Sequence, residues 1–271
     1  TLAAIGDAKV DWLVVDHYAL DARWEKRLQV KCNHLMVIDD LADRSHLCDV
    51  LLDQSLHCDS NARYQSLVSR CCRQFLGPSY ALLRPEFYKM RSISQGGDVR
   101  RVHVYFGGND LDNQAGRAIN ALIHFPQLAV YVVLGLNHPH RESVFEMTKS
   151  FPWITVTEVC HNMVATMADA DLALGVCGGA AWERCALGLP TLVCITADNQ
   201  RDDAESLHRL GAVENLGESA DVDTNQWIRA LSRVLDEPLR ISRMRQAARA
   251  IVAGNQECRH ELLDTLLDYG S

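Results

Sequence analysis

Short apolar runs alternate with helical stretches along this 271-residue chain, and this alternation restricts the fold more than any other feature. Strands that alternate with helices form βαβ units around a parallel sheet. The second part of the chain predicts six such strands, at residues 102–106, 129–134, 154–156, 172–174, 191–195 and 212–215. The remainder, from Thr224 onward, reads as helix with breaks near Pro238 and Gly254. The pattern therefore predicts a six-stranded, doubly wound domain.

A shorter series of the same kind precedes it, with strands expected at residues 11–16, 34–39 and 48–53. Three strands are few for a parallel sheet that is covered on both faces. A polar, glycine-containing segment at residues 92–98 has the composition of a linker, so we expect domains at residues 1–91 and 92–271. The predicted class is α/β and GT-B-like: two Rossmann-like domains with parallel sheets, the N-terminal one incomplete. Ligands of such sheets bind outside the carboxyl ends of the strands.

Composition excludes several other classes. The formal net charge of −8 argues against nonspecific nucleic-acid binding, which needs a basic surface. No apolar run reaches about 18 residues, so we expect no membrane span. The ten cysteines include no CxxC pair and several lie in apolar patterns, which indicates a reduced, cytoplasmic protein. One cluster could suggest a zinc site, formed by His46, Cys48, His57 and Cys58. Its spacing fits no standard zinc pattern, so we expect neither a metal nor a cofactor.

The stretch 168–200 carries the strongest functional signal. A buried run ends at Val176, Gly178 and Gly179 follow, and a helix is expected to begin near Ala180. Glycines allow a ligand to approach the backbone closely, and free N–H groups with the positive dipole end attract phosphate. Glu183, in the first turn, could accept hydrogen bonds from ribose hydroxyls. The alternative is an ordinary strand–helix turn with a solvated glutamate.

Three further loops place polar residues after predicted strands. Asp16, His17 and Tyr18 could supply an acid, a base and a hydrogen-bond donor, or form a strand end whose aspartate caps the next helix. Gly107 and Gly108, in the segment 107–110, could form a phosphate-contacting turn with the helix that follows, or a tight strand–helix turn. The fourth loop, 197–200, ends in Asn199 and Gln200. Polar groups collected at one edge of parallel sheets are typical of a binding site.

Other polar residues are expected to have structural roles. Asp39 and Asp40 follow a strand and are expected to cap the next helix. His138 and His140 flank a proline and are expected in solvent. The arginines at residues 240–249 are expected to form a solvated helix face and not an anion site.

Several motifs together resemble one family, the UDP-2,4-diacetamido-2,4,6-trideoxy-β-L-altropyranose hydrolases of pseudaminic acid biosynthesis. They are VVDHY at 14–18, IDDLADR at 38–44, CDVLLDQS at 48–55, GPSYALLRPEF at 77–87, FGGND at 106–110, GGAAWERCALGLPTLV at 178–193 and ADNQ at 197–200. They occur in family order over nearly the whole chain. The GG…E…GLP…NQ part is shared more widely and is similar to the UDP-binding half of the lipid II N-acetylglucosaminyltransferase.

The resemblance implies that the C-terminal domain holds uridine and diphosphate. It would place Gly108 and Asn109 near the phosphates, the N–H groups of Gly179 and Ala180 on the diphosphate and Glu183 on the ribose. Asn199 and Gln200 would line the site, and Tyr18 would lie by the sugar. The implied reaction is attack of water on the anomeric carbon with release of UDP, and it does not require a metal because oriented donors can stabilise the leaving group.

The chain departs from this family at one point. The family's catalytic base is a histidine in a GxGHxxR motif, which occurs nowhere in this sequence and is expected upstream of Thr1. We therefore expect an N-terminally truncated hydrolase with poor activity. Two alternatives remain open at this point, a GT-B glycosyltransferase that uses a UDP-sugar and a UDP-binding fragment without catalysis. The sequence leaves the oligomeric state open.

Overall fold

The computed structural model describes residues 5–57, 60–90, 98–158, 160 and 162–269. Their contacts divide the chain into two compact units. Unit 1 contains residues 1–82 and 253–271, and unit 2 contains residues 83–252. The boundary expected between residues 91 and 92 lies outside the described residues. The division differs from that expectation in two respects, because residues 83–90 belong with unit 2 and residues 253–271 belong with the N-terminal unit.

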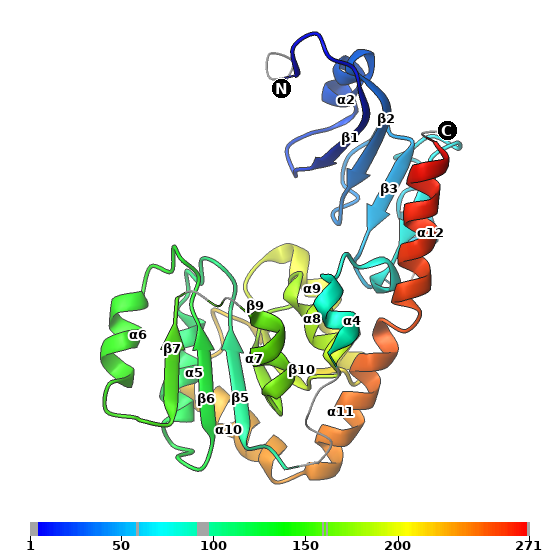
Figure 1. Ribbon diagram of the computed structural model, residues 1–271. Helices are drawn as coiled ribbons and strands as arrows, with labels where there is room; N and C mark the ends of the chain where they lie inside the picture. The colour runs from blue at the N-terminus through cyan, green and yellow to red at the C-terminus, as the bar shows by residue number, and fades with distance from the viewer. Residues whose placement is uncertain (1–4, 58–59, 91–97, 159, 161, 270–271) are drawn as a thin grey trace. The chain divides into compact units, whose positions relative to one another are not determined.

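Unit 1 is built on a four-stranded sheet in the order β1-β2-β3-β4, in which all neighbours are parallel (Figure 1). Its elements are β1 (Val10–Asp16), α2 (Ala22–Leu28), η1 (Gln29–Lys31), β2 (Cys32–Ile38), β3 (Val50–Asp53), α3 (Ser60–Arg63), β4 (Arg73–Leu76), η2 (Pro78–Tyr80) and α12 (Asn255–Asp268). The three strands expected from the sequence are present. The strand β4 was not expected, because its sequence RQFL buries only Phe75.

The C-terminal helix α12 completes the hydrophobic core of unit 1. Leu262, only 3% exposed, packs with Met36, Leu52 and Phe75 from three of the four strands. The indole N–H of Trp12 on β1 donates to the carbonyl oxygen of Leu266 at 3.0 Å. These contacts explain why residues so far apart in the sequence form one unit.

Unit 2 is a six-stranded parallel sheet in the order β10-β9-β8-β5-β6-β7, with helices on both faces (Figure 1). Counted from β5, this is the 3-2-1-4-5-6 order of a doubly wound nucleotide-binding sheet. Its elements are α4 (Pro85–Lys89), β5 (Arg101–Tyr105), α5 (Gln114–Leu122), β6 (Ala129–Val133), α6 (Arg141–Thr148), β7 (Ile154–Thr157), α7 (Met163–Asp169), β8 (Leu172–Gly175), α8 (Ala180–Leu187), β9 (Thr191–Ile195), η3 (Asp198–Gln200), α9 (Arg201–Arg209), β10 (Val213–Glu218), α10 (Thr224–Leu235) and α11 (Pro238–Ile251).

The six predicted strands of unit 2 are confirmed, and so are the helix breaks near Pro238 and Gly254. The central strands β8 and β9 are buried along their whole length, as expected for a parallel sheet between two helical layers. The strand order reverses between β5 and β8, which pair directly. This switch point is where a doubly wound sheet opens a crevice for a ligand.

No helix among the described residues is both long enough and apolar enough to cross a membrane.

Candidate functional site

The turn after β8 is open and has unused backbone donors. Gly179 is the N-cap of α8, and no side chain caps the helix. Among the described residues, no acceptor contacts the N–H groups of Gly179 or Ala180. A Cβ atom added to Gly178 or Gly179 would meet nothing within 4 Å, so packing does not require glycine at either position. Open space beside free N–H groups at a helix N-terminus suits a phosphate group.

A buried arginine lies directly behind this turn. Arg184 on α8 is 2% exposed and donates from Nη2 to the carbonyl oxygen of Val176. A Cβ on Gly175 would lie 3.1 Å from its Nη1 and 2.5 Å from the carbonyl oxygen of Tyr105, so the guanidinium lies at the β5–β8 switch point. Burial lowers the pKa of Arg184. No carboxylate within the described residues is bonded to this buried guanidinium, which places positive charge where the strand order reverses.

Glu183 is oriented by Arg84. The Nη2 of Arg84 lies 3.2 Å from Glu183 Oε1, and the side chains are 52% and 20% exposed. Arg84 precedes α4, which packs against α8, and its guanidinium lies 5.2 Å from the ring centroid of Phe87. The sequence segment RPEF therefore braces the glutamate. Arg84 contacts Glu183 at Oε1, and a carboxylate offers about four lone-pair sites, so acceptor capacity remains for a hydroxyl group.

Neither cysteine that packs behind this turn is suited to act as a nucleophile. Burial raises the pKa of Cys177 to about 12 and that of Cys185 to about 12. Both thiols are therefore protonated at neutral pH, and the thiolate is the nucleophilic form.

The loop after β5 does not offer the helix N-terminus that Gly107 and Gly108 suggested. Asp110 occupies it, because its carboxylate accepts the N–H groups of Gln114 at 2.8 Å and Ala115 at 2.7 Å. Phosphate contact at Gly108 and Asn109 would therefore rely on the loop backbone alone. The backbone of Gly108 packs directly against Gly135 in the loop after β6. A Cβ atom on Gly135 would lie only 2.2 Å from the carbonyl oxygen of Gly108.

The expectation that His138 lies in solvent is wrong. His138 is 3% exposed, and its Nε2 lies 3.1 Å from Asp110 Oδ2. His140 is half-buried, with Nε2 at 3.1 Å from the carbonyl oxygen of Leu111. Both histidines thus tie the loop after β6 to the loop after β5. The sequence His138-Pro139-His140 is typical of an exposed loop, so it could not predict the contact with Asp110.

The loop after β9 is closed by its own glutamine. The Oε1 of Gln200 accepts from the Thr196 backbone at 3.3 Å and from the Thr196 hydroxyl at 3.2 Å. Asn199 is exposed at the carboxyl end of the strand. Gln200 can still donate from its amide nitrogen, and the two residues remain candidates for contacting a ligand.

Asp16, His17 and Tyr18 belong to unit 1, at the carboxyl end of β1, and all three are exposed. Asp16 does not cap the next helix, because Asp21 is the N-cap of α2. His17 Nδ1 accepts the N–H of Ala19 at 3.0 Å. The Tyr18 hydroxyl lies 3.2 Å from Asp40 Oδ2 and donates to it.

Asp39 does not cap a helix either, and that expectation is wrong. Asp39 accepts the N–H of Ala42 at 2.9 Å and pairs with Arg44 at 2.8 Å, within a loop. The hydroxyl of Tyr64 contacts Asp39 Oδ2 at 3.0 Å and Asp53 Oδ2 at 3.1 Å. The segments IDDLADR and CDVLLDQS therefore form one buried polar network that positions the end of β2 and β3.

Among the described residues, no group of His, Cys, Asp and Glu is arranged to hold a metal ion. Of the four residues that suggested zinc, His46 bonds Glu25 at 2.6 Å and Cys48 Sγ lies 3.6 Å from Cys72 Sγ. Cys58 lies outside the described residues.

Comparison with known proteins places this geometry in a family. Residues 113–260, more than half of the chain, match the model of the glycosyltransferase family 28 C-terminal domain. The spore coat polysaccharide biosynthesis protein SpsG of Bacillus subtilis is 25% identical over 93% of this chain and 76% of its own length. The UDP-2,4-diacetamido-2,4,6-trideoxy-β-L-altropyranose hydrolase of Campylobacter jejuni is 32% identical, over 40% of this chain and 39% of its own length.

The solved structures agree on the fold. MurG of Acinetobacter baumannii superposes with a TM-score of 0.63, covering 95% of this chain and 74% of that one at 12% identity. The GT-B-like fold expected from the sequence is thereby confirmed. With a family model matched over more than half of its length, the chain belongs to the glycosyltransferase family 28 C-terminal domain family.

Proposed function

We propose that this protein binds a UDP-sugar at the β5–β8 switch point and breaks the anomeric C–O bond with release of UDP. One observation carries the proposal. The free N–H groups of Gly179 and Ala180 face open space in front of the buried Arg184, while Glu183 stands within the first turn of the same helix. This supplies donors and positive charge for a diphosphate and an acceptor for ribose.

The donors would act mainly on the leaving group. As the C–O bond breaks, negative charge develops on the UDP phosphate, and donors already oriented toward it stabilise the transition state. Their contribution does not depend on a metal. In this proposal Gly178 gives room for the phosphates, Gly108 and Asn109 contact them from the neighbouring loop, and Asn199 and Gln200 line the site toward the sugar.

The proposal has two forms, which differ in the molecule that receives the sugar: another metabolite or polymer in a glycosyltransferase, or water in a hydrolase. The family match and the likeness to SpsG favour transfer to an acceptor molecule by a UDP-sugar-dependent glycosyltransferase. The partial identity with the hydrolase supports water as the acceptor, with Tyr18, Asp16 and His17 near the sugar and pseudaminic acid biosynthesis as the context. A cytoplasmic location, expected from the cysteine pattern, stays a prediction for both forms, and flagellin glycosylation would be the wider context of the hydrolase form.

Calorimetric titration with UDP tests the binding site. Glu183→Ala is expected to weaken UDP binding by about 1.5–3 kcal/mol, because it removes hydrogen bonds to a charged group. Glu205→Ala, which removes an exposed carboxylate from the neighbouring helix α9, is the matched control and should bind like the wild type. Equal affinity of the Glu183 variant and the control would remove Glu183 from the site.

Product analysis then distinguishes the reactions. Free sugar and UDP formed without an added acceptor would indicate hydrolysis. UDP release that requires an acceptor would indicate transfer. UDP binding without turnover under both conditions would support the third possibility, a UDP-binding fragment without catalysis.

A further inference from the structure

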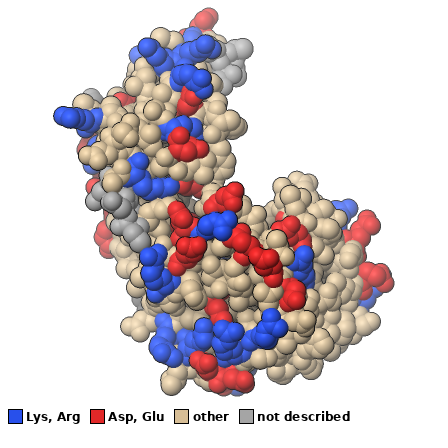
Figure 2. Space-filling model, turned by 180° about the vertical axis from the view of Figure 1, so that it is seen from behind, with Lys and Arg blue, Asp and Glu red and all other residues tan. Residues whose placement is uncertain are grey.

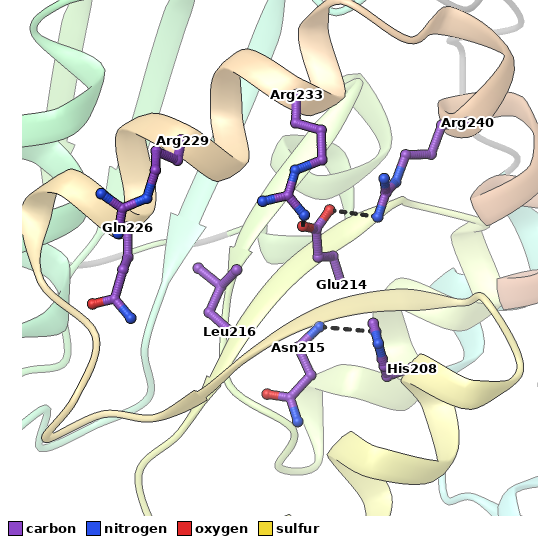
Figure 3. A pocket seen from close by; sticks show the side chains of 8 residues that line it. All are labelled: His208, Glu214, Asn215, Leu216, Gln226, Arg229, Arg233 and Arg240. Carbon is purple, nitrogen blue, oxygen red and sulfur yellow. Dashed lines mark hydrogen bonds and ion pairs between the residues drawn. The ribbon is translucent and has the colours of Figure 1, made fainter.

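Unit 2 has a hollow on the free edge of its sheet, separate from the turn after β8. Its volume is about 330 Å³, and it lies beside β10, between α9 on one side and α10 with α11 on the other (Figure 3). We call it the β10 edge hollow. It is lined by His208, Glu214, Asn215, Leu216, Gln226, Arg229, Arg233 and Arg240. None of these belongs to the proposed UDP-sugar site.

A buried carboxylate braces two arginines at this hollow. Glu214 is 3% exposed, and its Oε1 lies 2.8 Å from Arg233 Nη1 while its Oε2 lies 2.9 Å from Arg240 Nη2 (Figure 3). Arg240 Nη1 also lies 4.0 Å from Glu237 Oε2. Each guanidinium carries five N–H donors in a fixed plane, so these carboxylate contacts still leave donors unused. Because the bracing residue is buried, the two side chains are held in place before any ligand arrives.

Arg229 adds a charge that is not neutralised. It lies one turn before Arg233 on α10, is exposed, and makes no ion pair or hydrogen bond within the described part of the chain. Like charges four residues apart on a helix repel each other. Three arginines and one glutamate give the lining a positive balance on a chain whose net charge is −8. Figure 2 shows basic side chains gathered in a band in the region of α10 and α11.

The neutral residues of the lining also present donors. His208 Nδ1 lies 3.3 Å from both the backbone nitrogen of Asn215 and the carbonyl oxygen of Val213, so this ring nitrogen is engaged by the chain's own backbone. Gln226 uses its Oε1 in the capping box of α10, accepting the N–H of Asp223 at 2.8 Å, which leaves its amide nitrogen as a donor. Glu214 accepts a hydrogen bond from Arg233 at Oε1 and forms an ion pair with Arg240 at Oε2. The only carboxylate of the lining is therefore already paired with its arginines.

We propose that the β10 edge hollow binds a small molecule that carries a phosphate or diphosphate group. Planar guanidinium groups match the oxygens of a phosphate through paired hydrogen bonds. The volume is at the lower end of small-molecule sites, which suits a compact metabolite. The inference is independent of the proposed UDP-sugar site.

Titration of the whole chain with pyrophosphate, followed by calorimetry, tests this site. Arg229→Gln is expected to weaken one class of pyrophosphate sites about fivefold to tenfold, because a charged donor to phosphate is lost. Since Arg229 has no partner in the described chain, the substitution leaves the folded contacts intact. Arg229→Lys keeps the charge and should retain part of the affinity. The matched control is Arg243→Gln, an exposed arginine of α11 that is bonded only to its own helix and lies outside the lining.

Further measurements distinguish the β10 edge hollow from the proposed UDP-sugar site. They also distinguish a small phosphate-bearing ligand from a nucleic acid. The Arg229-dependent site should persist in Glu183→Ala and should weaken as the salt concentration rises. Pyrophosphate binding by Arg229→Gln within twofold of the wild type and of Arg243→Gln would overturn the proposal. So would Arg229-dependent binding of a single-stranded oligonucleotide in the absence of measurable pyrophosphate binding, since the ligand would then be a nucleic acid.

Discussion

At the scale of single residues, the Arg84–Glu183 pair connects the segment RPEF to the ribose position proposed above. Arg84→Ala leaves Glu183 free to rotate, so UDP affinity is expected to fall about twofold to fivefold, the range of a half-exposed ion pair. Arg84→Lys should lie between the variant and the wild type. Calorimetry with UDP measures both, and a rise in affinity in Arg84→Ala would show that Arg84 competes with the ribose instead of orienting Glu183.

A second residue makes the stability of unit 2 depend on pH. Burial, with a smaller contribution from the nearby Arg184, lowers the pKa of His103 on β5 to about 3. The unfolded chain takes up this proton near pH 6.5 and the folded chain does not, so stability is present above pH 6.5 and is lost as the pH falls toward 3. Between pH 7 and pH 5, the unfolding free energy of unit 2 should therefore fall by roughly 1–2 kcal/mol less in His103→Leu than in the wild type.

Urea-dependent hydrogen exchange of peptides that contain β5, recorded at both pH values, measures this difference. His124→Gln, which changes an exposed histidine of the same unit, should leave the pH dependence as it is in the wild type. An equally steep pH dependence in His103→Leu would mean that another group is responsible.

The sequence predicts some of these residues and not others for a physical reason. Gly178, Gly179 and Glu183 lie within six residues of each other, so local spacing alone indicates a turn, a helix start and an acceptor. Arg84 is 99 residues from Glu183, and a sequence pattern cannot show that contact. Arg184 reads as an ordinary helix residue, because its burial depends on how α8 packs on β8.

At the scale of single elements, Asp110 determines how α5 begins. Asp110→Ala removes the acceptor of two backbone N–H groups and the partner of His138, and it should destabilise the start of α5 by about 1–2 kcal/mol. Hydrogen exchange at residues 114–122 should be faster in this variant. Asp112→Ala is the control, because Asp112 contacts Ser219 and bonds no N–H group of α5. Unchanged protection of α5 in Asp110→Ala would show that Asn113, the N-cap, is sufficient.

Elements with a strong apolar run were predictable, and those without one were not. The strands β8 and β9 bury every residue and β5 and β6 bury three of five, so continuous apolar segments located these four. The edge strand β4 exposes Arg73 and Gln74, and its sequence does not differ from that of a loop. Asp39 and Asp16 were expected at helix starts. Asp39 instead contacts Arg44 and Tyr64, and Asp21 caps the helix that follows Asp16.

At the scale of the whole molecule, the assignment of α12 to unit 1 gives a separate test. Leu262→Ala creates a cavity between α12 and the sheet and should destabilise unit 1 by about 2–5 kcal/mol, while unit 2 is unaffected. Leu263→Ala, one position further on the same helix and 45% exposed in the wild type, should change stability by less than about 0.5 kcal/mol. Hydrogen exchange resolved by unit measures both variants, and equal loss of protection in the two units would contradict the division.

The position of α12 has a consequence for synthesis of the protein. Its first residue, Asn255, donates to the carbonyl oxygens of Ser79 at 2.9 Å and Ala81 at 3.0 Å, yet the ribosome makes it only after residues 83–252. At about 5–20 residues per second, roughly 10–30 s separate the sheet of unit 1 from its covering helix. During that interval Met36 and Phe75 lack the partner that buries them. The unit that is translated first is thus the one that finishes folding last, and the nascent chain exposes an apolar face to chaperones until α12 emerges.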